Sequence, residues 1–155
     1  MEKIFSTQPI NGNVKQLSIL LADDDTDDCN FFKETLEELP LSTHLTTVHD
    51  GEELMKYLSE NLEHLPDVLF LDLNMPRKTG LECLSEINKN EKLKDIPVFV
   101  FSISYPRDAI SMLFKTRAHA YIQKHSDLAQ LKQSIHDALT MVVEKKPLDG
   151  QGKNL

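Results

Sequence analysis

The sequence predicts an α/β domain, a doubly wound, five-stranded parallel sheet with helices on both faces. Strand-like and helix-like segments alternate five times along its 155 residues, and such alternation is typical of parallel strands joined by helical crossovers. An apolar run from Val68 to Leu71 leads into Asp72 and is followed by Pro76 and Gly80, as in a strand that is buried on both faces. Polar residues follow several strands, at the edge where open parallel sheets bind ligands.

The first half of the chain is predicted to form three strands and two helices. The helices start near Asp27 and after Gly51, and Pro40 ends the first one. Their inward-facing residues recur at helical spacing and are Phe32, Leu36 and Leu39 in the first helix and Leu54, Tyr57, Leu58 and Leu62 in the second. The strands are apolar or β-branched runs at residues 17–22, 45–48 and 68–71.

The second half continues the alternation. Gly80 begins a helix, Pro97 precedes a buried strand that ends in Ser102, and Ser126, a favoured N-cap residue, precedes the last helix. The charged segment 89–95 is interpreted as a solvated helix end and loop. The other predicted elements are strands at residues 98–101 and 118–123 and a helix at residues 107–117. Each of these three helices has apolar residues at helical spacing on its inner face. In chain order they are Leu81, Leu84 and Ile87; Ile110, Leu113 and Phe114; and Leu128, Leu131, Ile135, Ala138, Leu139 and Val142.

Length and composition fit one globular domain. With 40% apolar and 27% charged residues, the chain has the balance of an ordinary folded protein. Residues 1–16 are predicted to form a flexible lead-in, residues 17–143 the folded domain, and residues 144–155 a polar tail. The net charge of −8 argues against a nucleic-acid partner.

The N-terminal residues, the lengths of the apolar runs and the cysteines indicate the cellular compartment. The first residues do not have the pattern of a signal peptide, and no apolar run approaches the ~20 residues that span a bilayer. Cys29 and Cys83 lack metal-binding or redox spacing and are expected to be free thiols, which fits a reducing compartment. We therefore expect a cytoplasmic protein without a membrane partner.

Five polar side chains are expected to meet at the carboxyl ends of the strands. Asp23 and Asp24 follow the first strand, Asp72 the third, Ser102 ends the fourth, and Lys124 follows the fifth. Clustered carboxylates repel one another and raise each other's pKa, and a hard divalent cation such as Mg²⁺, which prefers oxygen ligands, relieves that repulsion. The ammonium and the hydroxyl complete a site for a phosphoryl group.

At these strand ends the chain resembles the receiver domain of bacterial response regulators, over residues 17–143. Residues 71–76 (Leu-Asp-Leu-Asn-Met-Pro), followed by Gly80, are similar to the family's phosphorylation-site segment. Residues 73–80 are also similar to stand-alone receivers that serve phytochrome-type kinases. The other matching segments are residues 20–25 for the acidic pair, residues 100–102 for the switch Ser or Thr, and residues 120–124 for the switch aromatic residue and Lys.

The resemblance implies a flavodoxin-like fold and a role for each residue of the site. Asp72 would be the nucleophile that takes a phosphoryl group from a phosphohistidine. Asp24 and Asp72 would bind Mg²⁺ directly, together with the backbone carbonyl of Asn74, and Asp23 would hold a metal-bound water. Lys124 would pair with the phosphoryl group. Such transfers rely on positioning and on stabilisation of charge.

The resemblance also implies a switch and not a turnover enzyme. Ser102 would move to bind the phosphoryl group and Tyr121 would change rotamer with it. The chemistry would be limited to Mg²⁺-dependent self-phosphorylation and autodephosphorylation. The donor would be a histidine kinase or phosphotransfer protein of a two-component phosphorelay, and output would pass to a downstream protein through the face formed by residues 107–143.

Two positions depart from the family pattern. Ile103 follows Ser102 where a small residue is usual, and its bulk is expected to slow the entry of water. His125 follows Lys124 where Pro is usual and the bond is usually cis. Because a non-proline cis bond costs ~3–4 kcal/mol, the Lys124–His125 bond either carries that strain or is trans.

Two alternatives use the same acidic segment. Asp23, Asp25, Asp27 and Glu34 fall at EF-hand positions, but Asp28 stands where the Ca²⁺ loop needs Gly. A phosphatase of the haloacid-dehalogenase type would use Asp23 and Asp25, but its pattern requires Thr or Val where Asp27 stands. We expect Asp25, Asp27 and Asp28 to be solvated residues at a helix N-terminus.

Overall fold

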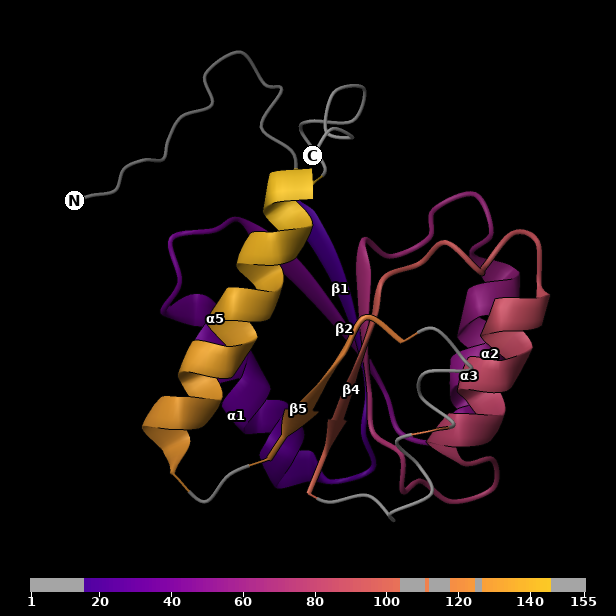
Figure 1. The fold of residues 1–155 in the computed structure, drawn as a ribbon, viewed down its shortest axis with the longest axis horizontal. Helices are drawn as coiled ribbons and strands as arrows, with labels where there is room; N and C mark the ends of the chain where they lie inside the picture. The colour runs from indigo at the N-terminus through magenta and orange to yellow at the C-terminus, as the bar shows by residue number, and fades with distance from the viewer. Residues whose placement is uncertain (1–15, 104–110, 112–117, 125–126, 146–155) are drawn as a thin grey trace.

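The computed structural model describes residues 16–103, 111, 118–124 and 127–145. Its strands form one parallel sheet in the order β2-β1-β3-β4-β5, with helices on both faces (Figure 1). The predicted doubly wound fold is therefore confirmed. The strands are β1 (Leu17–Ala22), β2 (Thr43–Val48), β3 (Val68–Leu71), β4 (Val98–Ser102) and β5 (Ala120–Gln123). The helices are α1 (Thr26–Glu37), α2 (Gly51–Glu60), α3 (Gly80–Lys89) and α5 (Leu128–Lys145).

The helices cover the sheet as two layers. Helices α1 and α5 lie on one face, and α2 and α3 lie on the other (Figure 1). The predicted helix at residues 107–117 lies outside the described residues apart from Ser111. Within the described ranges, every helix is too short or too polar to cross a bilayer. The two cysteines, Cys29 and Cys83, are free, as predicted, and both are buried.

The central strand β3 packs on both faces. Val68 and Phe70 belong to the core under α1 and α5, whereas Leu69 and Leu71 belong to the core under α2 and α3. All four side chains are fully buried, which explains why the sequence of this strand is continuously apolar. The strand therefore presents its first polar side chain only where it ends, at Asp72.

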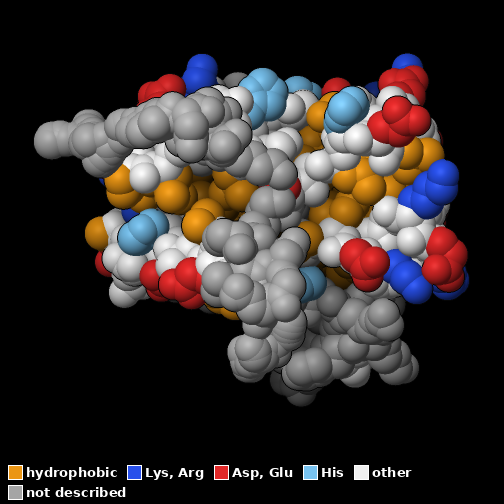
Figure 2. Space-filling model, turned by 90° about the horizontal axis from the view of Figure 1, so that it is seen from above, with side chains coloured by type: hydrophobic (Ala, Val, Ile, Leu, Met, Phe, Trp, Pro, Cys, Tyr) orange, Lys and Arg blue, Asp and Glu red, His pale blue; other side chains and the backbone are white. Residues whose placement is uncertain are grey.

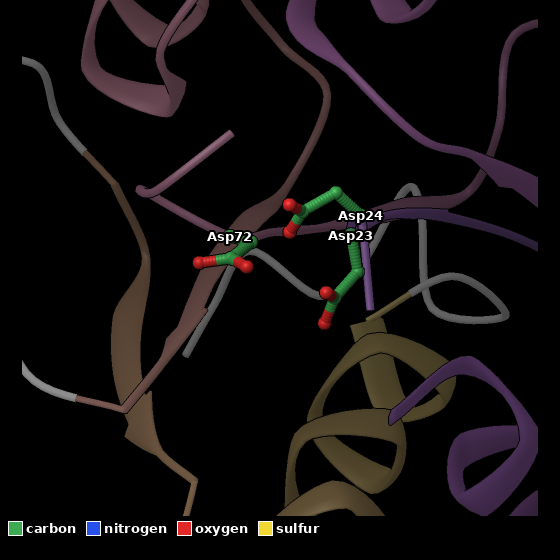
Figure 3. A group of neighbouring side chains, drawn as sticks. All are labelled: Asp23, Asp24 and Asp72. Atoms are coloured by element: carbon green, nitrogen blue, oxygen red, sulfur yellow. The ribbon is translucent and has the colours of Figure 1, made fainter. Parts of the chain in front are cut away.

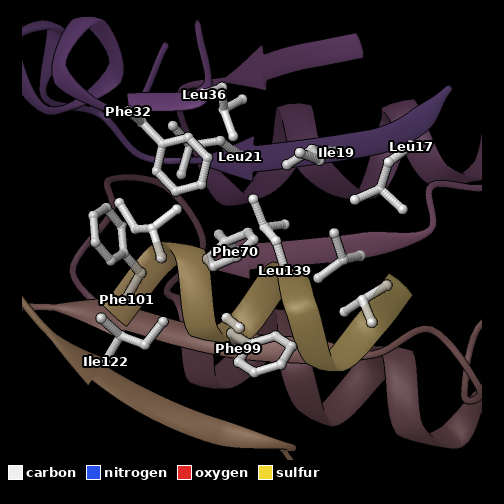
Figure 4. Close-up of a cluster of buried hydrophobic side chains, with 14 of the residues drawn as sticks. Leu17, Ile19, Leu21, Phe32, Leu36, Phe70, Phe99, Phe101, Ile122 and Leu139 are labelled. Atoms are coloured by element: carbon white, nitrogen blue, oxygen red, sulfur yellow. The ribbon is translucent and has the colours of Figure 1, made fainter. Parts of the chain in front are cut away.

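Aromatic packing anchors the core under α1 and α5. The ring of Phe70 lies 4.8 Å from that of Phe32 and 5.5 Å from that of Phe99, measured between centroids (Figure 4). Phe101 completes the group, 5.6 Å from Phe32. Because these rings come from α1, β3 and β4, they join the first helix to the middle of the sheet.

Hydrophobic side chains are visible at the edge where the strands begin (Figure 2). Figure 2 views the molecule from that edge and shows hydrophobic side chains in two areas, with charged and histidine side chains around them. The acidic residues that follow β1 and β3 lie at the opposite edge, where the strands end. The candidate chemistry therefore lies at the carboxyl end of the sheet, where core residues such as Leu71 and Phe101 also pack.

Several predicted boundaries shift by a few residues. Strand β2 begins at Thr43, two residues earlier than predicted, and β5 begins at Ala120, two residues later. Leu39 lies beyond the end of α1 but still packs on the core. Leu62, predicted on the inner face of the second helix, is exposed because α2 ends at Glu60 and the helical register is lost.

Two further predictions were wrong in detail. Leu128 shares the spacing of the α5 stripe but is 55% exposed, because periodicity predicts only the direction of a side chain and burial also needs a neighbour opposite. Leu93, within the segment predicted to be solvated, is buried against the α2–α3 core.

Asp127 caps α5 by accepting hydrogen bonds from the amides of Ala129 and Gln130. The predicted cap, Ser126, lies outside the described residues.

Candidate functional site

The ends of two neighbouring strands bring three carboxylates together. Asp23 and Asp24 directly follow β1, and Asp72 directly follows β3. Backbone hydrogen bonds from Asp72 N to Ala22 O (2.9 Å) and from Asp23 N to Val48 O (3.0 Å) extend the sheet pairing into these residues. One carboxylate oxygen from each Asp lies within 4.8 Å of the other two (Figure 3). The structure thus gathers three of the predicted site residues at one edge.

Local backbone contacts orient the two buried carboxylates. Asp23 is fully buried and Asp72 nearly so, whereas Asp24 is exposed. Oδ1 of Asp23 accepts a hydrogen bond from Asp25 N, and Oδ1 of Asp72 accepts one from Asn74 N, both at 3.0 Å. The Oδ1 atom of each carboxylate therefore holds the loop that follows its strand. The Oδ2 atoms of Asp23 and Asp72 remain available to a charged partner.

Lys124 supplies that partner. Its amide donates to Ser102 O at 2.8 Å, which continues the pairing of β4 and β5 beyond the last strand residue. Its Nζ lies 2.7 Å from Asp23 Oδ2 and 3.3 Å from Asp72 Oδ2. The side chain is only 8% exposed, and Nζ lies 5.1 Å from the centroid of the Phe101 ring. The ammonium is thus held inside the site.

Asp28 is a member of the site that the sequence did not predict. Its Oδ2 accepts a hydrogen bond from Lys124 Nζ at 2.8 Å, so it is not simply a solvated residue at the start of a helix. Asp25 is the N-cap of α1, which makes Asp28 the third residue of the helix. Asp28 lies in the first turn of the helix that follows a strand ending in the site. That position could have identified Asp28 from the sequence.

Burial and charged neighbours shift the pKa values of Asp23 and Lys124. Burial raises the pKa of Asp23 from its ordinary value to about 7, although the Lys124 ammonium and the Asp25 amide oppose the change. Burial acts to lower the pKa of Lys124, but Asp23 and Asp28 outweigh it and raise that pKa above its usual value. The ammonium therefore stays charged at neutral pH, and Asp23 is a carboxylate that a further cation would stabilise.

The donor set fits a hard divalent cation. Asp23 Oδ2 is buried and receives no well-oriented hydrogen bond from any described residue, although Lys124 Nζ is close to it. Together with Asp24 and Asp72 it offers only oxygen ligands, which suits Mg²⁺ and similar ions. Asn74 is placed beside this group by its hydrogen bond to Asp72.

The loop after β3 depends on a close approach by Gly80. The amide of Gly80 donates to Leu73 O at 3.0 Å, and a Cβ at this position would lie 2.2 Å from the backbone oxygen of Asp72. Thr79 caps α3 in a capping box with Glu82. Only glycine allows the helix to begin this close to the Asp72 backbone.

We expect Gly80→Ala to displace the Asp72 loop, because the added methyl group overlaps a backbone oxygen. The free energy of unfolding, measured in urea, should fall by more than about 2 kcal/mol. Thr79→Ala is the control, since loss of an N-cap costs about 1 kcal/mol. An equal loss in the two variants would show that the Gly80 contact does not determine the loop.

The predicted switch residues are adjacent in the structure. Ser102 ends β4 and is fully buried. Tyr121 pairs with Val100 across β4 and β5, and its hydroxyl donates to the backbone oxygen of Ser102 at 3.3 Å. Ile103, the first departure from the family pattern, is 65% exposed. The Lys124–His125 bond, the second departure, involves a residue outside the described ranges.

The acidic segment does not have the geometry of an EF-hand. Only three residues, Asp23 to Asp25, separate β1 from α1, whereas a Ca²⁺ loop has 12 residues between two helices. Asp25 uses its carboxylate to cap α1, accepting from the amides of Asp27 and Asp28. The calcium-binding alternative is therefore unsupported, and the phosphatase alternative gains no support either.

Comparisons with known proteins identify the family of the chain. The chain matches the family model of the response regulator receiver domain over residues 19–136. It is 32% identical over 117 residues to response regulator Rcp1 of Synechocystis sp., which covers 73% of this chain and 80% of that protein.

Two solved structures resemble the fold closely. The phosphorylated cyanobacterial phytochrome response regulator RcpA superposes with a TM-score of 0.76 at 33% identity, covering 83% of this chain and 95% of that one. The Mn²⁺-bound form of response regulator Rcp1 superposes with a TM-score of 0.74 at 30% identity and the same coverage. With most of its length matched by the family model and a carboxylate–lysine cluster at the strand ends, the chain belongs to the response regulator receiver domain family.

Proposed function

We propose that Asp72 accepts a phosphoryl group from a histidine kinase or a phosphotransfer protein, and that the phosphorylated chain signals through protein–protein contacts. The observation that carries the proposal is the Lys124 ammonium, held 3.3 Å from Asp72 Oδ2 beside Asp23 and Asp24. The relatives support it, since RcpA is described as phosphorylated. Two-component signalling is the role of the family.

The chemistry follows from the positions of the side chains. A carboxylate oxygen of Asp72 attacks phosphorus, the P–N bond of the phosphohistidine breaks, and the imidazole leaves with the electron pair of that bond. Lys124 offsets the negative charge of the transferred group. Mg²⁺, bound by Asp24, Asp72 and the backbone carbonyl of Asn74, with Asp23 holding a metal-bound water, would neutralise the remaining charge. Rcp1 has been solved in a Mn²⁺-bound form, which supports a divalent ion here.

The proposed role is a switch, with no substrate turned over beyond the phosphoryl group of Asp72. Ser102 would bind the phosphoryl group and Tyr121 would follow by a change of rotamer. We place the receiver domain at residues 17–143, in the cytoplasm, although α5 continues to Lys145. The proposed output face, residues 107–143, includes β5 and α5, while its first part lies outside the described residues apart from Ser111.

Acetyl phosphate with Mg²⁺ should add one phosphoryl group to the protein, seen as a single mass increase of the intact chain. Asp72→Asn should remove the increase, because the amide is not a nucleophile, and a chelator should also abolish it. Asp27→Asn is the matched control, an exposed acidic residue five positions after Ala22. Labelling of the Asp72→Asn variant at the wild-type rate would identify another nucleophile.

Ile103→Ala should shorten the lifetime of the phosphoryl group several-fold, because the smaller side chain admits water more readily to the switch region. The measurement is the decay of the intact-mass signal after the phosphodonor is removed. Leu62→Ala, which truncates an exposed apolar side chain in another loop, serves as the control. An unchanged lifetime in Ile103→Ala would show that bulk at this position is irrelevant.

A further inference from the structure

We propose that Asp28 is a positioning residue that competes with the phosphoryl group for Lys124 and so weakens the phosphorylated state. The inference rests on the proposed function of Asp72 and adds a restraint to it. Asp28 comes from α1, whereas Asp23 and Asp72 come from the ends of β1 and β3. Lys124 is therefore attracted from the helix as well as from the sheet.

Lys124 lies closer to Asp28 than to the proposed phosphoacceptor Asp72. Its Nζ lies 2.8 Å from Asp28 Oδ2 but 3.3 Å from Asp72 Oδ2, and both are hydrogen bonds. Asp23 Oδ2, at 2.7 Å, is the third carboxylate oxygen around the ammonium. An ammonium group has three N–H donors, and the hydrogen bonds to Asp28 and Asp72 take up two of them, beside the ion pair with Asp23. The longest of the three contacts is the one to the phosphoacceptor.

A phosphoryl group on Asp72 changes this balance. It brings a charge of about −1.5 to −2 at neutral pH, and Lys124 must direct at least one N–H to it. Asp28 resists this movement, because its bond to Lys124 is short and charge-assisted. The Asp28 side chain is 32% exposed, so after release it can be solvated by water. Replacing it by Asn should therefore leave Lys124 freer to bind the phosphoryl group.

The same helix turn provides a matched control in Asp27. It also lies in the first turn of α1, so Asp27→Asn removes one negative charge from the helix N-terminus just as Asp28→Asn does. Its side chain is exposed, whereas Asp28 contacts Lys124. A difference between the two variants therefore reports the contact with Lys124 and not the loss of acidic charge.

The test measures the affinity for beryllofluoride, a mimic of the phosphoryl group, by NMR titration at a Mg²⁺ concentration that saturates each variant. We expect Asp28→Asn to lower the half-saturating beryllofluoride concentration about 3–10-fold relative to wild type, and Asp27→Asn to change it less than about 2-fold. Equal values for the two variants, or weaker binding by Asp28→Asn, would overturn the proposal.

A double-mutant cycle then tests whether Asp28 acts through Lys124. The rate of phosphorylation by acetyl phosphate is measured for Asp28→Asn and Asp27→Asn, each with Lys124 intact and with Lys124→Met. The proposal predicts that Asp28→Asn is faster than Asp27→Asn only when Lys124 is present. An advantage that persists with Lys124→Met overturns it, since the effect would then arise elsewhere. Failure of the wild-type chain to bind beryllofluoride would instead remove the proposed function itself.

Discussion

Asp23→Asn is expected to stabilise the metal-free protein by roughly 2–4 kcal/mol at pH 8. The reason is the burial of an ionised carboxylate, which raises the pKa of Asp23 from 3.8 to about 7. Each tenfold change in the acid dissociation constant corresponds to about 1.4 kcal/mol of free energy between the folded and unfolded states. Asn removes that charge and keeps an oxygen that can accept the hydrogen bond from Asp25 N.

The sign of the pH dependence follows from the raised pKa. Between about pH 4 and pH 7 the folded protein binds more protons at Asp23 than the unfolded chain does, so this contribution to stability is present below pH 4 and is lost as the pH rises through 7. The advantage of Asp23→Asn should therefore be partial at pH 5 and full at pH 8. Urea unfolding in a chelator measures it, with Asp27→Asn as the control. An equal advantage at both pH values would exclude charge burial as the cause.

Phe70→Ala is expected to lower the free energy of unfolding by about 3–5 kcal/mol. Phe70 is fully buried in the central strand, and its ring contacts those of Phe32 and Phe99. Truncation would leave a cavity between α1 and the sheet that close-packed neighbours cannot fill. Urea unfolding of the variant measures the loss.

Phe31→Ala is the matched control for this truncation. Phe31 precedes Phe32 on α1 and is only partly buried against the same core, so its removal should cost clearly less. Equal losses in Phe31→Ala and Phe70→Ala would mean that the aromatic group around β3 does not anchor the fold as proposed.

The strand pattern was predictable because burial leaves a strong trace in the sequence. A largely apolar run in β1 and a continuous one in β3 mark strands that pack on both faces. The residues that follow these strands had to lie at one edge of a parallel sheet. The positions of Asp23, Asp24, Asp72 and Lys124 followed from topology alone.

The remaining features depend on three-dimensional contacts that periodicity does not encode. Asp28 belongs to a run of acidic residues that look alike in the sequence. Asp28 contacts Lys124 and Asp27 does not, because of the direction in which α1 places each side chain. Leu93 is buried although its neighbours in the sequence are charged. The close approach of Gly80 to Asp72 is likewise a property of the loop and not of the sequence pattern.

The most direct test of the central claim is to identify the phosphorylated residue. Borohydride reduces an acyl phosphate to an alcohol, so a phosphorylated aspartate is converted into homoserine, which peptide mass spectrometry can locate. After treatment with acetyl phosphate and Mg²⁺, we predict homoserine at position 72 and aspartate at positions 23, 24 and 28. Homoserine at any of those three positions, with Asp72 unmodified, would contradict the account.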